Sequence, residues 1–107
     1  MAQLPTIRDI AIDLYTEANI DYHNETLESV PQDNREGFDT VVISAEAIRY
    51  TTDAGNLMIQ EVVGMDEDYN ETTLDYLYSI EDTEGYTEEN GTDSAEELIA
   101  VIKNFMA

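Results

Sequence analysis

Hydrophobic residues near the N-terminal end of the chain recur with the spacing of a helix. Ile7, Ile10, Ala11, Leu14, Tyr15 and Ala18 follow the i, i+3, i+4, i+7 pattern of an amphipathic helix. Thr6 stands where an N-cap is expected, and Asp9 follows it three residues later, in the first turn. The pattern predicts a helix that begins after Thr6 and runs to about residue 18.

A second helix is predicted at the C-terminal end. Its apolar face consists of Leu98, Val101, Ile102, Phe105 and Met106. Asp93 and Ser94 both suit an N-cap, and Ser94 with Glu97 matches the Ser-x-x-Glu capping box. Glu96 and Glu97 fall in the first turn and Lys103 near the last, which is the charge order that the helix dipole favours.

Segments with the character of strands lie between the two helices. They are Phe38–Ser44, Ala47–Thr52, Leu57–Val63 and Thr73–Ile80. Asp53-Ala54-Gly55-Asn56 separates the second and third of them, which predicts a hairpin with a glycine-assisted turn. In the fourth, Leu74, Tyr76, Tyr78 and Ile80 alternate with Asp75, Leu77 and Ser79. A helix over Ser44–Asp53 is the alternative for the second segment.

Two polar segments carry no clear periodicity. Asn19–Gly37 is rich in turn residues, and Asn24–Val30 within it is a candidate short helix ended by Pro31. We expect His23, the only histidine, to be an exposed loop residue. Glu81–Thr92 is predicted to be an acidic loop punctuated by glycine. Together these elements predict one α+β domain over residues 1–107, with three to four antiparallel strands, an N-terminal and a C-terminal helix.

The net charge of −21 in 107 residues is extreme, because a small domain usually carries a charge of magnitude about 2–8. The hydrophobic content of 42% is nevertheless sufficient for a core, so the charge does not imply disorder. Self-repulsion on this scale opposes folding and disfavours nucleic acid and anionic membranes as direct partners. Basic proteins, metal cations and high-salt solvent remain as the surroundings that such a charge favours.

The chain contains no cysteine, which excludes disulfides, thiolate metal sites and cysteine nucleophiles. Its first residues, Met1–Pro5, lack the basic and apolar regions of a signal peptide. No apolar run approaches the ~18 residues of a membrane span. We therefore expect a soluble cytoplasmic protein.

The acids are concentrated in the stretch Glu61–Glu97, which holds 14 acidic side chains and no lysine or arginine. Leu74–Ile80 has the pattern of a folded strand in the middle of this stretch. An acidic surface with fixed spacing is therefore predicted, rather than a flexible acidic tail. Asp9, Asp13 and Glu17, which recur every four residues on the first helix, form an acidic ridge that either extends this surface or lies elsewhere.

Catalytic and metal-binding signatures are missing from the sequence. Asp66, Asp68 and Asn70 match positions one, three and five of an EF-hand loop, but Glu71 replaces the required glycine and Leu77 the bidentate glutamate. There is no phosphate-binding glycine loop, no HExxH and no basic patch with aromatics. We expect a non-enzyme with no cofactor and no dedicated metal site.

Mimicry of nucleic acid explains the acidity best. Proteins bind DNA phosphates with lysine and arginine, so regularly spaced carboxylates on a rigid protein can enter the same basic groove. Tyrosine adds contact area at such interfaces. The candidate partner-binding residues are Asp66, Glu67, Asp68, Tyr69, Glu71, Asp75, Glu81, Asp82, Glu84, Tyr86, Glu88 and Glu89, with Asp9, Asp13 and Glu17 of the ridge. Tyr76 and Tyr78 are expected to be core residues instead.

In size, charge and lack of cysteine the chain resembles the acidic DNA-mimic inhibitors of phages and mobile elements. These small proteins block restriction enzymes, CRISPR effectors, uracil-DNA glycosylase or nucleoid proteins. The anti-CRISPR type is similar in combining a small sheet with helices that bear acids and tyrosines. The resemblance is one of composition over the whole chain, and it implies a basic nucleic-acid-binding protein as the partner. For a chain of phage origin it also implies action in the host cytoplasm.

Two other hypotheses remain open. Adaptation to high salt replaces lysine with acids over the whole surface, and one lysine in 107 residues fits that; the clustering of acids in the second half does not. An acidic chaperone or interaction module for a basic partner more often uses a flexible tail. The oligomeric state also stays open, with a dimer among the possibilities.

Overall fold

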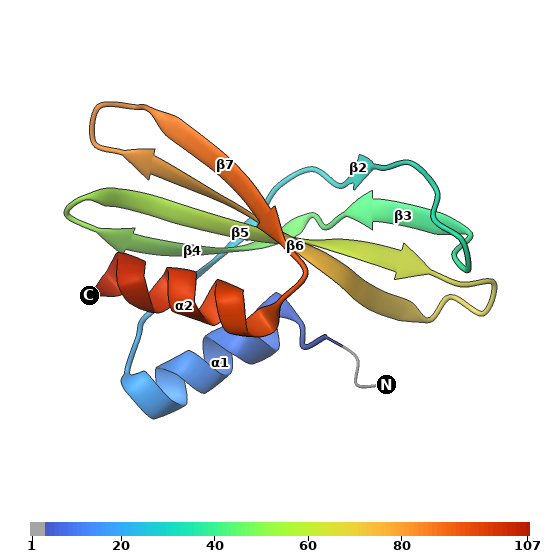
Figure 1. The fold of residues 1–107 in the computed structure, drawn as a ribbon, viewed down its shortest axis with the longest axis horizontal. Helices are drawn as coiled ribbons and strands as arrows, with labels where there is room; N and C mark the ends of the chain where they lie inside the picture. Colours follow the sequence, from blue (N-terminus) through green and yellow to red (C-terminus); the bar gives the residue numbers. More distant parts are fainter. Residues whose placement is uncertain (1–3) are drawn as a thin grey trace.

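The computed structural model describes residues 4–107. Figure 1 shows the elements in chain order: α1 (Ile7–Ala18), β1 (His23–Thr26), β2 (Val30–Pro31), β3 (Thr40–Ile43), β4 (Glu46–Thr52), β5 (Gly55–Met65), β6 (Glu71–Asp82), β7 (Thr87–Thr92) and α2 (Ala95–Met106). The predicted α+β class, with one helix at each end of the chain and an antiparallel sheet between, is confirmed. Residues 1–3, on which the expectation of no signal peptide partly rests, lie outside the described residues.

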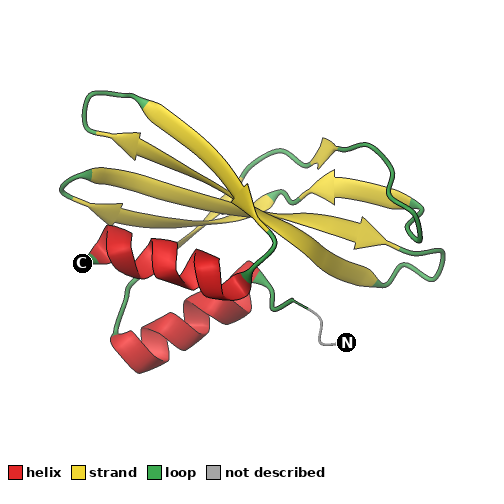
Figure 2. Cartoon of the chain, viewed as in Figure 1, coloured by secondary structure: helices red, strands yellow, loops and turns green. Residues whose placement is uncertain are grey.

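The sheet is built around β5, which has a long partner on one edge and two short partners on the other. β6 pairs with β5 from Met65↔Glu71 to Gly55↔Asp82. On the opposite edge, β4 pairs with the first half of β5 and β3 with the second half. β1 extends the sheet beyond β4, β2 beyond β3, and β7 beyond the second half of β6 (Figure 2).

The sheet has seven strands, so the expectation of three to four was wrong. The four expected strands are present, and the helix over Ser44–Asp53 is excluded because β4 occupies that segment. The candidate helix over Asn24–Val30 is also wrong, since β1 begins at His23 and pairs with β4. The segment Glu81–Thr92 is not a loop but the end of β6, a turn and β7.

The missed strands share a physical property. β1, β2 and β7 have almost wholly exposed side chains, so no alternation of apolar and polar residues marks them. Backbone pairing with a neighbouring strand forms them instead. His23 is exposed as expected, although it belongs to β1 and lies opposite Arg49 rather than in a loop.

The predicted caps of both helices are present. The Thr6 hydroxyl accepts a hydrogen bond from the Asp9 N–H at 3.1 Å, and the Ser94 hydroxyl accepts one from the Glu97 N–H at 3.2 Å. The capping box at α2 contains an extra member. The Ser94 N–H donates to the Thr92 hydroxyl, which in turn donates to the Glu97 carboxylate at 2.7 Å.

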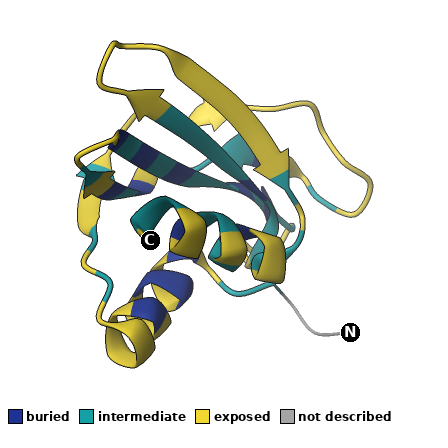
Figure 3. Cartoon of the chain, turned by 60° about the vertical axis from the view of Figure 1, so that its left-hand side comes forward, coloured by how far each residue is buried: buried dark blue, intermediate teal, exposed yellow. Residues whose placement is uncertain are grey.

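The two helices pack on one face of the sheet, over the part that contains β4. α1 packs against β4 and β5, and α2 against β4 and β7. The core between these layers consists of Ile7, Ile10, Ala11, Leu14, Ile48, Tyr50, Leu57, Ile59, Tyr76, Leu98 and Ile102. Figure 3 shows the buried residues on the inner sides of the helices and along β4 and β5. Tyr15, expected on the buried face of α1, is half exposed, at 51%.

Two side chains of the sheet fix the start of α1. Glu61 of β5 accepts the N–H of Ile7 at 2.7 Å and the Thr73 hydroxyl at 3.3 Å. The hydroxyl of Tyr76, on β6 opposite Glu61, donates to the Pro5 carbonyl at 2.5 Å. Because the first N–H groups of a helix have no partner within it, the sheet supplies one of the acceptors that α1 needs.

No helix among residues 4–107 has the length and apolar character that crossing a membrane requires.

Candidate protein-binding surface

The strand β6 carries an acidic turn at each of its ends. The first turn, between β5 and β6, is named here the proximal turn and runs over residues 66–71. The second lies between β6 and β7 and is named the distal turn. It covers residues 81–89, which include the end of β6 and the beginning of β7. Every residue of both turns except Asp66 is exposed. The structure therefore divides the predicted acidic surface into two separate groups.

In the proximal turn the carboxylate of Asp66 organises the backbone. Its Oδ1 accepts the N–H groups of Asp68 at 2.9 Å and Asn70 at 3.0 Å. These hydrogen bonds favour the charged form, and that from the Asn70 backbone is the largest cause of the lowered pKa of Asp66. Asp66 is thus a structural residue, which explains its EF-hand-like spacing with Asp68 and Asn70 without a metal.

The distal turn repeats the same arrangement. Asp82 Oδ1 accepts the N–H groups of Glu84 at 2.9 Å and Tyr86 at 3.0 Å. In both turns the first aspartate also donates its own N–H to the carbonyl of the fifth residue, at 3.2 Å in the proximal turn and 2.9 Å in the distal one. The predicted contact acids whose carboxylates accept no backbone N–H in either turn are therefore Glu67, Asp68 and Glu71 in the first turn, and Glu81, Glu84, Glu88 and Glu89 in the second.

One tyrosine projects from each turn. Tyr69 is 83% exposed and Tyr86 is 73% exposed, in agreement with the prediction that these two tyrosines, and not Tyr76 or Tyr78, lie at the surface. Tyr76 is buried and Tyr78 packs against the core. Tyr69 also has a positive φ of 64°, at the position that Gly85 occupies in the distal turn with φ 90°. A large side chain is uncommon in this left-handed conformation.

The length of β6 fixes the distance between the turns. Its 12 residues, Glu71–Asp82, span about 36 Å at about 3.3 Å per residue. The whole molecule measures 43 Å along its longest axis, so the turns occupy its two ends. Because the Debye length is about 8–10 Å at physiological salt, acids within one turn repel each other while the two turns are electrically independent.

The acidic side chain in the middle of β6 is neutralised by an ion pair. Asp75, predicted as a contact residue, forms an ion pair with Arg35 at 2.5 Å. The other two arginines are paired as well, Arg8 with Glu46 and Arg49 with Glu25. The ion pairs neutralise acids on the strands of the sheet and leave those of the turns unpaired by arginine.

The ridge of α1 lies away from the turns. Asp9, Asp13 and Glu17 are exposed on the side of α1 that does not face the core. In Figures 1 and 3, α1 lies on one side of the molecule and the β6–β7 hairpin on the other, with α2 between them. The structure does not bring the ridge and the distal turn onto one face.

Burial changes the ionisation of one acid on the sheet. The pKa of Glu61 is raised, chiefly by desolvation and further by the nearby carboxylates of Glu46 and Asp9; its hydrogen bonds with Ile7 and Thr73 act in the opposite direction. Burial also raises the pKa of Tyr76 to about 12. Both groups lie where α1 meets the sheet and belong to the scaffold rather than to either turn.

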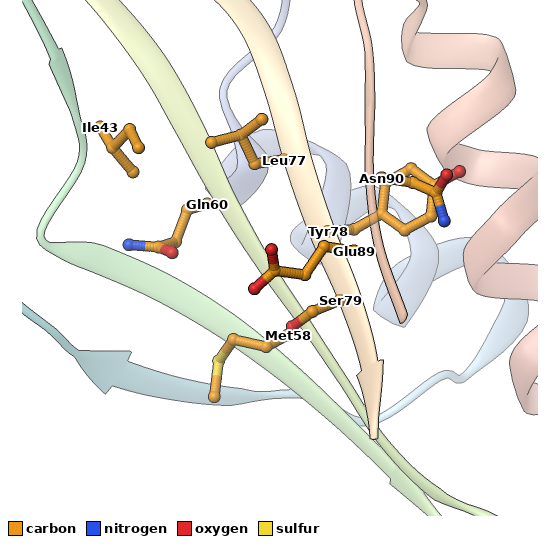
Figure 4. Close-up of a pocket in the computed structure, with 8 residues that line it drawn as sticks. All are labelled: Ile43, Met58, Gln60, Leu77, Tyr78, Ser79, Glu89 and Asn90. Carbon is orange, nitrogen blue, oxygen red and sulfur yellow. The ribbon is translucent and has the colours of Figure 1, made fainter. Parts of the chain in front are cut away.

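Sequence reasoning missed a shallow cleft on the face of the sheet opposite the helices. It has a volume of about 230 Å³ and is lined by Ile43, Met58, Gln60, Leu77, Tyr78, Ser79, Glu89 and Asn90 (Figure 4). These residues come from four strands, so no sequence motif joins them. The one available signal was Leu77, an apolar residue on the same face of β6 as Asp75 and Ser79.

Nothing in the described part of the chain gathers three or more histidine, cysteine, aspartate or glutamate side chains in a geometry that could hold a metal ion. Comparisons of the chain with protein-family models, with curated proteins and with solved structures find no match. The features of the molecule that bear on its function are the two turns and the sheet that separates them.

Proposed function

We propose that this protein is a non-enzymatic inhibitor that mimics the phosphate backbone of nucleic acid. In this proposal it occupies the basic nucleic-acid-binding groove of a target in the cytoplasm, such as a CRISPR effector, a restriction enzyme or another DNA-binding protein. The observation that carries the proposal is the pair of exposed acidic turns at the two ends of β6.

The separation of the turns supports this reading. About 36 Å along β6 corresponds to one turn of duplex DNA, which is about 34–36 Å long. Proteins that read two half-sites one turn apart place their cations at that spacing. Two acidic turns held apart by a rigid strand would meet those cations together, and the ion-paired middle of β6 would face the space between them.

The construction of the turns gives a second line of support. Each carboxylate-bonded backbone is ordered before binding, so a partner would not need to fix a flexible acidic loop. The exposed tyrosines Tyr69 and Tyr86 offer rigid contact area beside the acids, and tyrosine is enriched among binding hot spots. A flexible acidic chaperone would require neither feature.

The test reverses charge without breaking the turns. One variant changes Glu67, Asp68 and Glu71 to lysine, and a second changes Glu81, Glu84 and Glu88; Asp66 and Asp82 are kept because they organise the backbone. The immobilised protein captures its target from a lysate, and duplex DNA is added as competitor. We expect each variant to bind the captured target about 100-fold more weakly or worse, because like charges then face each other.

A third variant serves as the control. It changes Asp21, Glu28 and Asp33, which are exposed and lie outside both turns, to lysine and therefore alters the net charge equally. Binding by this control should remain close to that of the unmodified protein. A captured target that binds no nucleic acid, or equal loss of binding in all three variants, would contradict the proposal.

Adaptation to high salt is the second candidate function of the acids, and the ridge favours it. Asp9, Asp13 and Glu17 lie away from both turns, so one binding face does not use all of the charge. This candidate predicts that the protein unfolds in dilute buffer and refolds in molar KCl. A melting temperature that barely changes with KCl concentration would eliminate it.

A further inference from the structure

The cleft opposite the helices combines an apolar floor with hydrogen-bond acceptors. Ile43, Met58 and Leu77 supply the aliphatic surface, and Figure 4 shows the Glu89 side chain extending over it between Gln60 and Met58. Register places Leu77 opposite Gln60, and Ser79 between Met58 and Glu89, on this same face. A volume of about 230 Å³ is below the roughly 300–1,000 Å³ of small-molecule pockets, and suits a single side chain.

The polar groups of the cleft favour a cation. The Gln60 amide nitrogen is already used, since it donates to the Ser44 carbonyl at 2.8 Å, which leaves the amide oxygen as an acceptor. Glu89 is exposed and has no cationic neighbour among the ion pairs of the described residues. No lysine or arginine lines the cleft. Arg49 lines the adjoining depression beside Met58, but its guanidinium pairs with Glu25 at 3.1 Å.

The chain itself provides an example of a guanidinium on this face. Arg35, from the segment between β2 and β3, forms its ion pair with Asp75, and both residues line a hollow together with Leu77. Asp75 and Leu77 are two residues apart on β6 and therefore on the same face, about 6–7 Å from each other. An arginine side chain thus already lies next to the cleft, in a hollow that the same leucine lines.

We propose that the cleft receives the side chain of one lysine or arginine from the basic partner. The methylene stem packs on Met58 and Leu77, as long cationic side chains do on apolar surface, and the cationic head bonds to Glu89 and the Gln60 amide oxygen. A second copy of this chain is a poor occupant, because each copy carries a charge of −21. This inference rests on the proposed function in taking the partner to be basic.

The experiment observes the cleft directly. The full chain, labelled at its methyl groups and its backbone amides, is titrated with Nα-acetyl-arginine amide and, separately, with the uncharged Nα-acetyl-glutamine amide, at constant ionic strength. We expect saturable shifts of the Ile43, Met58 and Leu77 methyl signals with the arginine amide only. The methyl signals of Ile102, in the core, should not move.

Two glutamine variants test the role of the carboxylate. Glu89→Gln should weaken binding at the cleft methyls about 2- to 5-fold, the effect of losing one partly exposed ion pair. Glu28→Gln removes the same charge at an exposed position outside both turns and the cleft, and should leave that affinity unchanged. Shifts confined to the backbone of residues 66–71 and 81–88, or equal shifts with the uncharged amide, would overturn the proposal.

The outcome is separable from that of the proposed function. The triple charge reversals in the turns leave Met58, Leu77 and Glu89 intact, so target capture can succeed or fail independently of the methyl titration. If the arginine amide does not bind in the cleft but the charge reversals in the turns still weaken target binding, this inference alone is overturned. Binding in the cleft with no effect of the charge reversals would overturn the proposed mimicry alone.

Discussion

Replacing Glu61 with glutamine is expected to stabilise the protein at neutral pH, whereas replacing it with alanine is expected to destabilise it. Glu61 does two opposing things in the fold. Its Oε1 accepts the N–H of Ile7 at 2.7 Å, at the start of α1. Its charge, however, is partly desolvated and lies near the carboxylates of Glu46 and Asp9, and these effects raise its pKa.

The sign of the pH dependence follows from the raised pKa. A carboxyl group whose folded-state pKa exceeds its unfolded value, which is ordinarily 4.5 for glutamate, adds stability that is fully present below the unfolded pKa. That stability is lost as the pH rises through the folded pKa. Glutamine keeps an acceptor for Ile7 without the charge, so the advantage of Glu61→Gln should appear at pH 7 and disappear toward pH 4.

Alanine removes the acceptor altogether. The Ile7 N–H is then left without a partner beside a buried side chain, which costs about 1–2 kcal/mol. For a domain of this size that corresponds to a fall in melting temperature of about 4–15 °C. The assay is thermal unfolding followed by circular dichroism from pH 4 to pH 8 at constant salt.

The matched control is Glu67→Gln in the proximal turn. Like Glu61→Gln it removes one negative charge, but it removes no contact at α1. The gain of Glu61→Gln over this control isolates the local effect from the general relief of repulsion. A melting temperature of Glu61→Gln at or below that of the control at pH 7, or a difference that does not change with pH, would refute the reasoning.

Three further changes test the scaffold by thermal or denaturant unfolding. Tyr50→Phe should be neutral or stabilising by up to about 1 kcal/mol, because the buried Tyr50 hydroxyl has no hydrogen-bond partner among the described residues; a loss above this magnitude would reveal a missed contact. Tyr69→Gly should stabilise the fold by about 1 kcal/mol by removing a left-handed tyrosine and should weaken target binding, whereas loss of stability would contradict the strain. Gly55→Ala should destabilise by more than about 2 kcal/mol, since φ is 140° and the added Cβ would lie 2.0 Å from the Glu81 carbonyl oxygen; Gly85→Ala, with φ 90° but nothing within 4 Å, is the milder comparison.

Local signals in the sequence were sufficient for the elements that bury an apolar face. The periodicity of α1 and α2 and the caps Thr6 and Ser94 identified both helices, because capping and amphipathic burial depend on residues within one or two turns. β3 to β6 were recognisable for a similar reason, since β-branched and aromatic residues favour half-buried strands. The hairpin at Asp53 followed from its turn residues.

Segments without a buried face escaped this reasoning. β7, with the sequence Thr-Glu-Glu-Asn-Gly-Thr, is a strand only because the edge of β6 offers backbone partners. The turn role of Asp66 and Asp82 was likewise hidden, since an aspartate that organises a turn and one that faces a partner look alike in a list of acids. The hydrogen bonds of each carboxylate separate the two cases.

The sequence alone determined the sign and size of the charge, its concentration between Glu61 and Glu97, and the two helices that close the domain. Only the tertiary structure decided how that charge is distributed. The full length of β6 carries the acids of its two turns to opposite ends of the molecule, α1 holds its ridge on another side, and Arg35 neutralises Asp75 in between. Charge is a sum over residues and can be counted in any order, whereas a surface depends on strand pairing between residues far apart in the chain.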